Sequence, residues 1–143
     1  MPEEINQVGI FLPVLVVVAL TYVAFIRMAA ARGSVAKSMD MNFYKAHQGG
    51  AEPEAAVVAV RHYGNLLELP TVFYAACLTA FALGAVGKWT LILAWGYVAA
   101  RLLQSAVHLT YNNPGHRGLA FVLGVVLSLA LWVNVALSVF ARL

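Results

Sequence analysis

The sequence predicts an all-α membrane protein, built as an antiparallel bundle of four transmembrane helices in one integral membrane domain over residues 1–143. Of the 143 residues, 62% are hydrophobic and 10% are charged, whereas about a quarter of the residues in soluble domains are charged. The mean hydropathy is +0.81. Four apolar stretches are each long enough to cross a hydrocarbon core of about 30 Å, and most of their connections are short.

The first predicted span covers residues 8–31. Glu3 and Glu4 stand where a signal peptide has basic residues, and the apolar run is longer than the core of a signal peptide. We therefore expect a helix that is retained in the protein. A polar loop with an interfacial turn is expected to follow over residues 32–53.

The second predicted span covers residues 55–83. Its start is indicated by Glu52-Pro53-Glu54, because proline suits the first helical turn and carboxylates suit the positive end of the helix dipole. At about 1.5 Å per residue this helix is longer than the hydrocarbon core, so its first turns are expected to project from the membrane.

The third and fourth spans follow after short turns. Gly84 and Gly87 predict a tight turn before the third span, residues 88–111. The segment 112–115, Asn-Asn-Pro-Gly, predicts the turn before the fourth span, residues 119–141.

Positive charges gather at the first and third connections, which predicts an orientation. The basic residues there are Arg27, Arg32, Lys37, Lys45 and Arg117, against Lys88 and Arg142 on the opposite side. The positive-inside rule then places both termini outside and the connections 1–2 and 3–4 in the cytoplasm. The lack of a eukaryotic retention signal favours a bacterial inner membrane.

Composition also argues against two classes of site. The net charge of +3 is diffuse, so no nucleic-acid partner is expected. The single cysteine, Cys77, provides neither a disulfide nor a pair of metal ligands. We therefore expect no metal site.

The second span carries a polar stripe. Arg61, Asn65 and Glu68 have the spacing i, i+4 and i+7, which keeps them on one helix face. A charged side chain near the bilayer centre costs at least about 2.5 to 3.5 kcal/mol, so such residues usually face the protein interior or a wet cavity. Pro70 removes a backbone donor and is expected to bend the helix nearby. The stripe is therefore a candidate functional site.

A second stripe follows the third span at matching depth. It comprises Arg101, Gln104, Ser105, His108, Tyr111 and Asn112. Counting residues places Glu68 and Arg101 at a similar depth, which predicts an ion pair and makes Glu68 the deeply buried charge. Arg117 follows on the same side. Together with Arg61, these arginines suit an anionic ligand that bears carboxylates.

Structural roles are the alternative for each group. The Arg-Asn-Glu stripe can lock helices together, and His108 can serve as an interhelical hydrogen-bonding group. Arg27, Arg32 and Lys45 are expected to anchor the protein at the membrane interface, in contact with lipid headgroups.

Two motifs resemble the MAPEG family, the membrane-associated proteins in eicosanoid and glutathione metabolism, which includes the microsomal glutathione transferases. The first is Arg-x-x-x-Asn-x-x-Glu in the second of four helices, here Arg61, Asn65 and Glu68. The second is an arginine in the third helix, here Arg101, followed after the turn by an arginine opening the fourth, here Arg117. The resemblance spans essentially the whole chain.

The resemblance implies a homotrimer of four-helix bundles that binds glutathione, as co-substrate, between subunits near the cytosolic face. Arg61, Asn65 and Glu68 would hold the polar ends of the tripeptide. Arg117 would contact the thiol as the catalytic residue. The implied ligand site would be completed by Arg101, Gln104, His108 and Tyr111. The implied activity is that of a glutathione (or related thiol) transferase or peroxidase acting on lipophilic small-molecule electrophiles.

The chain departs from the family pattern within these motifs. Gln104 stands where members have histidine or tyrosine, and His108 stands where they have tyrosine. Glu68 is followed by Leu69-Pro70, without the tyrosine of the leukotriene synthase branch. Together with Phe73-Tyr74, these features resemble the bacterial branch of the family and argue against leukotriene synthesis.

Two other functions fit the same residues. One is a non-catalytic protein that binds lipid or fatty acid, with the arginines holding the carboxylate. The other is a small transporter subunit that uses Glu68 and Arg101 as a charge relay. Membrane lipids are expected partners in each case.

Overall fold

The computed structural model describes residues 6–37, 41–46 and 52–143, and all of their regular structure is helical. A 3-10 turn, η1 (Gln7–Ile10), leads directly into α1 (Phe11–Val35). The other helices are the short α2 (Met41–Ala46) and the long α3 (Glu54–Ala82), α4 (Lys88–Leu109) and α5 (Pro114–Phe140). Glu3, Glu4 and part of the expected loop 32–53 lie outside the described residues.

Four helical segments are long and apolar enough to cross a membrane, over residues 7–35, 54–82, 88–109 and 114–140. The prediction of an all-α protein with four membrane-spanning helices is therefore confirmed. The short helix α2 lies within the expected loop, where the sequence predicted only an interfacial turn.

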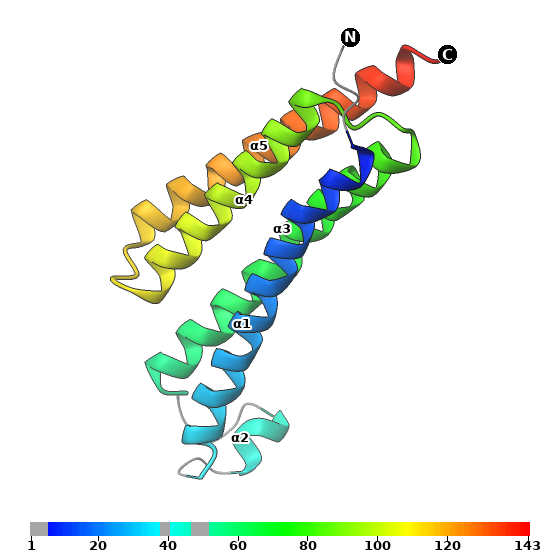
Figure 1. Cartoon of the computed structure of the whole chain (residues 1–143). Helices are drawn as coiled ribbons and strands as arrows, with labels where there is room; N and C mark the ends of the chain where they lie inside the picture. Colours follow the sequence, from blue (N-terminus) through cyan, green and yellow to red (C-terminus); the bar gives the residue numbers. More distant parts are fainter. Residues whose placement is uncertain (1–5, 38–40, 47–51) are drawn as a thin grey trace.

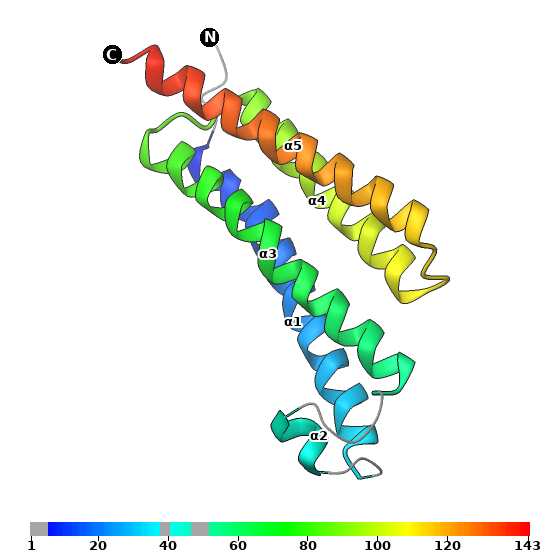
Figure 2. The ribbon, with the colours of Figure 1, turned by 180° about the vertical axis from the view of Figure 1, so that it is seen from behind.

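The four long helices lie in two side-by-side pairs, α1 with α3 and α4 with α5, in both views of the ribbon (Figures 1 and 2). Both termini and the turn 83–87 lie at one end of the bundle, and α2 and the turn 110–113 lie at the other (Figure 1). Gln7 secures the first end, because its side-chain amide donates to the Val86 carbonyl at 3.1 Å and accepts from the Val86 N–H at 2.9 Å.

An apolar core joins the helices in the half of the bundle that carries the termini. The rings of Phe73 in α3 and Tyr97 in α4 stack with their centroids 4.2 Å apart. Ile10 and Leu131 are fully buried in the same cluster, as is the Cys77 thiol. Long apolar side chains on the outer faces of α1 and α5 remain exposed, which suits surfaces that face lipid.

Helix α5 begins at Pro114, five residues before the expected start of the fourth span at residue 119. Asn113 caps the helix, since its side-chain oxygen accepts from the N–H groups of Gly115 at 2.9 Å and His116 at 3.1 Å. Proline is preorganised for the first helical position. Arg117 therefore lies within the first turn of α5, where its backbone is fixed.

Helix α3 continues without interruption through the buried Pro70. Polar side chains donate to helix carbonyls on either side of the proline. The Thr71 hydroxyl donates to the Glu68 carbonyl at 2.5 Å, and the Trp132 indole donates to the Val72 carbonyl at 3.1 Å. The stripe residues on α3 are therefore carried by one helical segment.

The Asn113 cap provides a test of this fold. Asn113→Ala removes the oxygen that accepts two backbone N–H groups, so the free energy of unfolding should fall by about 1 kcal/mol. The measurement is thermal unfolding of the detergent-solubilised protein. Asn113→Asp is the matched control, because it retains the capping oxygen and should unfold close to the unsubstituted protein; equal unfolding of all three proteins would contradict the assigned cap.

Candidate functional site

The polar stripe of α3 lies largely on the outside of the bundle. Arg61 and Glu68 are exposed, and Asn65 is half-buried. The sequence predicted Glu68 as the deeply buried charge and paired it with Arg101. Within this chain Glu68 is exposed, and the predicted pair is wrong, because Arg101 has other partners. The only ion pair within the described residues joins Arg32 and Glu52, at 3.1 Å.

Arg101 is the charge that the bundle buries, with 1% of its surface exposed. Its Nε donates to the Tyr97 hydroxyl at 3.0 Å, and its Nη1 donates to the side-chain oxygen of Gln104. The guanidinium carbon lies 5.1 Å from the ring centroids of both Tyr97 and Phe121, within the range of cation–π attraction. Its remaining nitrogen, Nη2, has no hydrogen-bond partner within the described residues.

The direction of the Arg101 side chain explains why it does not reach Glu68. The guanidinium packs against α5, where a Cβ added to Gly124 would lie 3.3 Å from Nη2. Glycine at this position therefore leaves the space in which the guanidinium lies between α4 and α5. Arg101 and Glu68 match in depth along their helices but point to different neighbours.

Arg101 also fixes the orientation of Gln104. A guanidinium group can only donate hydrogen bonds, so the atom of Gln104 that faces it must be the amide oxygen. The amide nitrogen of Gln104 is then left to donate in another direction. Gln104 itself is buried at the edge of a pocket.

This pocket lies between α3, α4 and α5 and has a volume of about 260 Å³. We call it the three-helix pocket; its lining comprises Asn65, Gln104, Pro114, Arg117, Gly118 and Phe121. The Nη1 of Arg117 donates to the side-chain oxygen of Asn112 at 2.8 Å, which holds the guanidinium in place. The lining contains an arginine and two amides but no carboxylate, so it suits an anionic group.

His108 and Tyr111, which the sequence assigned to the same site, lie elsewhere. His108 is buried towards α3, with its ring centroid 5.0 Å from that of His62. Tyr111 is exposed, and its hydroxyl is 2.9 Å from Nδ1 of His116 in a different, mainly apolar groove.

His62 is a buried polar residue that the sequence reading missed. Its Nε2 lies 2.9 Å from the Ser105 hydroxyl, which links α3 to α4 within the bundle. Helical periodicity could have predicted this position. His62 follows Arg61 directly, so its side chain points about 100° away from the stripe. The polar groups of α3 thus face two sides, one outward and one towards α4.

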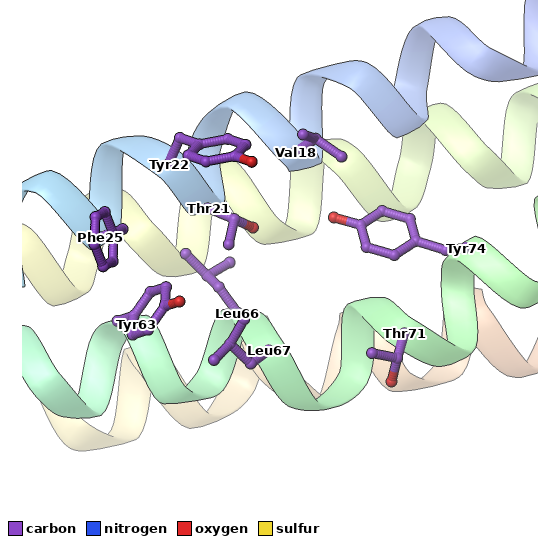
Figure 3. A pocket seen from close by; sticks show the side chains of 9 residues that line it. All are labelled: Val18, Thr21, Tyr22, Phe25, Tyr63, Leu66, Leu67, Thr71 and Tyr74. Atoms are coloured by element: carbon purple, nitrogen blue, oxygen red, sulfur yellow. The ribbon is translucent and has the colours of Figure 1, made fainter.

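An apolar groove runs between α1 and α3, with a volume of about 350 Å³. Side chains from the two helices point towards each other across it, among them Thr21 and Phe25 of α1 and Tyr63, Leu66 and Tyr74 of α3 (Figure 3). Tyr22 and Leu67 also line the groove. The rings of Phe25 and Tyr63 approach to 5.6 Å between centroids. Leu67 precedes Glu68, so the groove and the outer polar stripe share the same turns of α3.

Within the described residues, no group of three or more histidine, cysteine, aspartate or glutamate side chains is placed to hold a metal ion. The polar side chains that gather at the three-helix pocket, an arginine and two amides, each carry N–H donors. The arrangement can bind and orient an anion.

Comparison with known proteins gives one match. The model of the MAPEG family matches residues 10–137 of the chain. No curated protein and no solved structure matches it.

The contact between Arg101 and Gln104 can be tested through stability. Gln104→Leu removes the acceptor of a buried guanidinium and should lower the free energy of unfolding by about 1 to 3 kcal/mol. Gln104→Glu keeps an acceptor oxygen in that place and should unfold at or above the temperature of the unsubstituted protein, as measured by thermal unfolding in detergent. If both substitutions destabilise equally, the Gln104 oxygen is not the group that Arg101 requires.

Proposed function

The chain belongs to the MAPEG family, and from this premise we propose that it is a membrane-bound transferase or peroxidase that uses glutathione or a related thiol against lipophilic electrophiles. The observation that carries the proposal is the three-helix pocket. It combines Asn65, Gln104 and Arg117, from three different helices, in a lining without any carboxylate. These donors suit the carboxylates and the thiolate of such a tripeptide.

Arg117 is the proposed catalytic residue. A thiol with an ordinary pKa of about 8.5 is mostly protonated at neutral pH, and lowering this pKa to about 6.5 requires about 2.7 kcal/mol of stabilisation of the thiolate. A guanidinium held beside the sulfur supplies an interaction of this kind. Asn112 holds Arg117 through a 2.8 Å hydrogen bond, so the positive charge is oriented before the ligand arrives.

In the transfer reaction the thiol proton leaves to solvent and the thiolate sulfur attacks an electrophilic carbon. A carbon–sulfur bond forms, and its electron pair displaces a leaving group or moves to the neighbouring carbon. The apolar groove between α1 and α3 (Figure 3) supports the choice of a lipophilic substrate, because it opens on the same helix that carries Asn65.

The exposure of Glu68 supports the proposal of a homotrimer. Glu68 lies about 21 Å along α3 from Glu54, which places an exposed carboxylate at membrane depth. Facing lipid there costs at least about 2.5 to 3.5 kcal/mol. A neighbouring copy that covers Arg61 and Glu68 removes this cost and completes the ligand site between subunits.

The transporter interpretation has lost its structural basis, because Glu68 and Arg101 form no ion pair. Binding of a fatty acid without catalysis uses the same donors for a carboxylate. The absence of a thiolate in the complex distinguishes it from the proposed enzyme.

The chain is a multi-pass integral membrane protein, and we propose a bacterial inner membrane with both termini outside. The end of the bundle that bears α2 carries the greater positive charge. Its basic residues are Arg27, Arg32, Lys37, Lys45 and Arg117, whereas Lys88 and Arg142 lie at the opposite end. Positive charge favours the cytoplasmic side.

Thiolate formation tests the proposed activity. Glutathione added to the detergent-solubilised protein at neutral pH should give a thiolate absorbance, and the complex should consume a model electrophile. Arg117→Ala should abolish both signals. Gln104→Glu should weaken glutathione binding about tenfold or more while retaining stability, because a carboxylate oxygen replaces the donor that faces the pocket.

Lys37→Ala is the control for this experiment, because Lys37 is a cation at the same end of the bundle that does not line the three-helix pocket. It should leave the thiolate signal unchanged. Fatty-acid binding with no thiolate signal in the unsubstituted protein would favour the non-catalytic alternative.

Cysteine labelling tests the orientation, and the buried Cys77 gives a low background. Lys88→Cys, near the turn 83–87, should react with a membrane-impermeant thiol reagent in intact bacteria. Lys37→Cys should react only after the cells are permeabilised. The reverse pattern would place the termini in the cytoplasm.

A further inference from the structure

A second polar cavity lies at the end of the bundle that bears α2, away from the three-helix pocket. We call it the interfacial cavity; its lining includes Arg27, Glu54, Val58, His108, Thr110 and Asn112. These residues come from α1, the start of α3, the end of α4 and the turn after it. Its volume is about 350 Å³, within the range of about 300 to 1,000 Å³ that small-molecule sites occupy.

His108 is an unsatisfied polar group in this cavity. Only 2% of its surface is exposed, and neither ring nitrogen has a hydrogen-bond partner within the described residues. Since a buried polar group without a partner is costly, a ligand in the cavity that hydrogen-bonds to the imidazole would be favoured.

The other polar groups specify the charge of that ligand. Arg27 and Glu54 bring one positive and one negative charge to the lining, and they form no ion pair with each other. Asn112 accepts from Arg117 through its side-chain oxygen, so its amide nitrogen remains a donor. The cavity therefore presents donors for an anion and a separate carboxylate for a cation, which together match a zwitterion.

The position of the cavity matches the headgroup layer of a bilayer. It lies at the first turns of α3 and the end of α4, where the excess length of α3 over the hydrocarbon core is expected to project from the membrane. Val23 is exposed on α1 one turn before Arg27, on the same helix face. An acyl chain can follow this apolar surface towards the membrane centre while its headgroup occupies the cavity.

We propose that the interfacial cavity binds the phosphoethanolamine headgroup of a phospholipid. Arg27, His108 and Asn112 donate to the phosphate oxygens, and the Glu54 carboxylate accepts from the ammonium group. Choline has no N–H to donate to Glu54, and a glycerol headgroup brings no positive charge. The site therefore distinguishes phosphatidylethanolamine from phosphatidylcholine and phosphatidylglycerol. It shares no lining residue with the three-helix pocket, although Asn112 also accepts from Arg117.

The experiment uses the full chain in detergent, with each of the three phospholipids added in turn. Phosphatidylethanolamine should raise the unfolding temperature and remain bound in native mass spectrometry, with an affinity about tenfold or more above that for the other two lipids. Arg27→Gln should weaken binding of all three lipids. Glu54→Gln should remove only the preference for ethanolamine.

Lys37→Gln is the matched control, because it neutralises a charge at the same end of the bundle without touching the cavity. It should leave lipid selectivity unchanged. Equal binding of phosphatidylglycerol, or unchanged selectivity in Glu54→Gln, would overturn the proposal. So would displacement of the lipid by soluble glutathione, since the cavity would then belong to the thiol site.

The proposed lipid site does not depend on the proposed thiol-transferase activity. The lipid measurement needs no thiol, and Glu54 does not line the three-helix pocket. Loss of the thiolate signal with retained phosphatidylethanolamine selectivity would reject the enzyme and keep the lipid site.

Discussion

The guanidinium of Arg101, buried between α4 and α5, constrains the arrangement on which the candidate site depends. A charge removed from solvent is tolerated only if it is well partnered, and here its partners are the Tyr97 hydroxyl, the Gln104 oxygen and two aromatic rings. Gly124 leaves the space for it. Because Arg101 takes the oxygen of Gln104, the amide nitrogen is the atom that Gln104 has left to donate at the three-helix pocket, which it lines. A buried structural charge thus determines which polar atom the site offers.

The surrounding lipid imposes a second constraint, because it tolerates exposed apolar side chains but not exposed charges. Exposed leucine and valine side chains on α1 and α5 are unremarkable in this setting, whereas the exposed Glu68 is costly. The outer polar stripe of α3 is therefore the part of the monomer that most needs a neighbour. The proposed trimer follows from this requirement, since a site that is open on one side can be closed by another copy.

Neighbouring faces of α4 serve different purposes. Gln104 faces the pocket shared with α3 and α5, and His108, one turn further along, faces α3 and the interfacial cavity. The first environment combines an arginine with two amides, contains no carboxylate and suits an anion. The second combines Arg27 with Glu54 and suits a zwitterion. One turn of helix thereby separates a site proposed for a soluble thiol from a site proposed for a lipid headgroup.

The sequence by itself determined the four spans, because hydropathy, length and turn residues act locally along the chain. It also indicated the residues of the three-helix pocket through their spacing, although it placed the start of α5 at Leu119 rather than Pro114 by following hydropathy past the Asn113 cap.

Only the tertiary structure decided which of these side chains meet. Counting residues gave the depth of Glu68 and Arg101 correctly enough to suggest a pair, but depth says nothing about the rotation of each helix about its axis. That rotation is set by packing at Gly124 and by the stacked rings of Phe73 and Tyr97. It turned Arg101 inward to α5 and left Glu68 outside. It also brought His62, which the sequence analysis had not singled out, against His108.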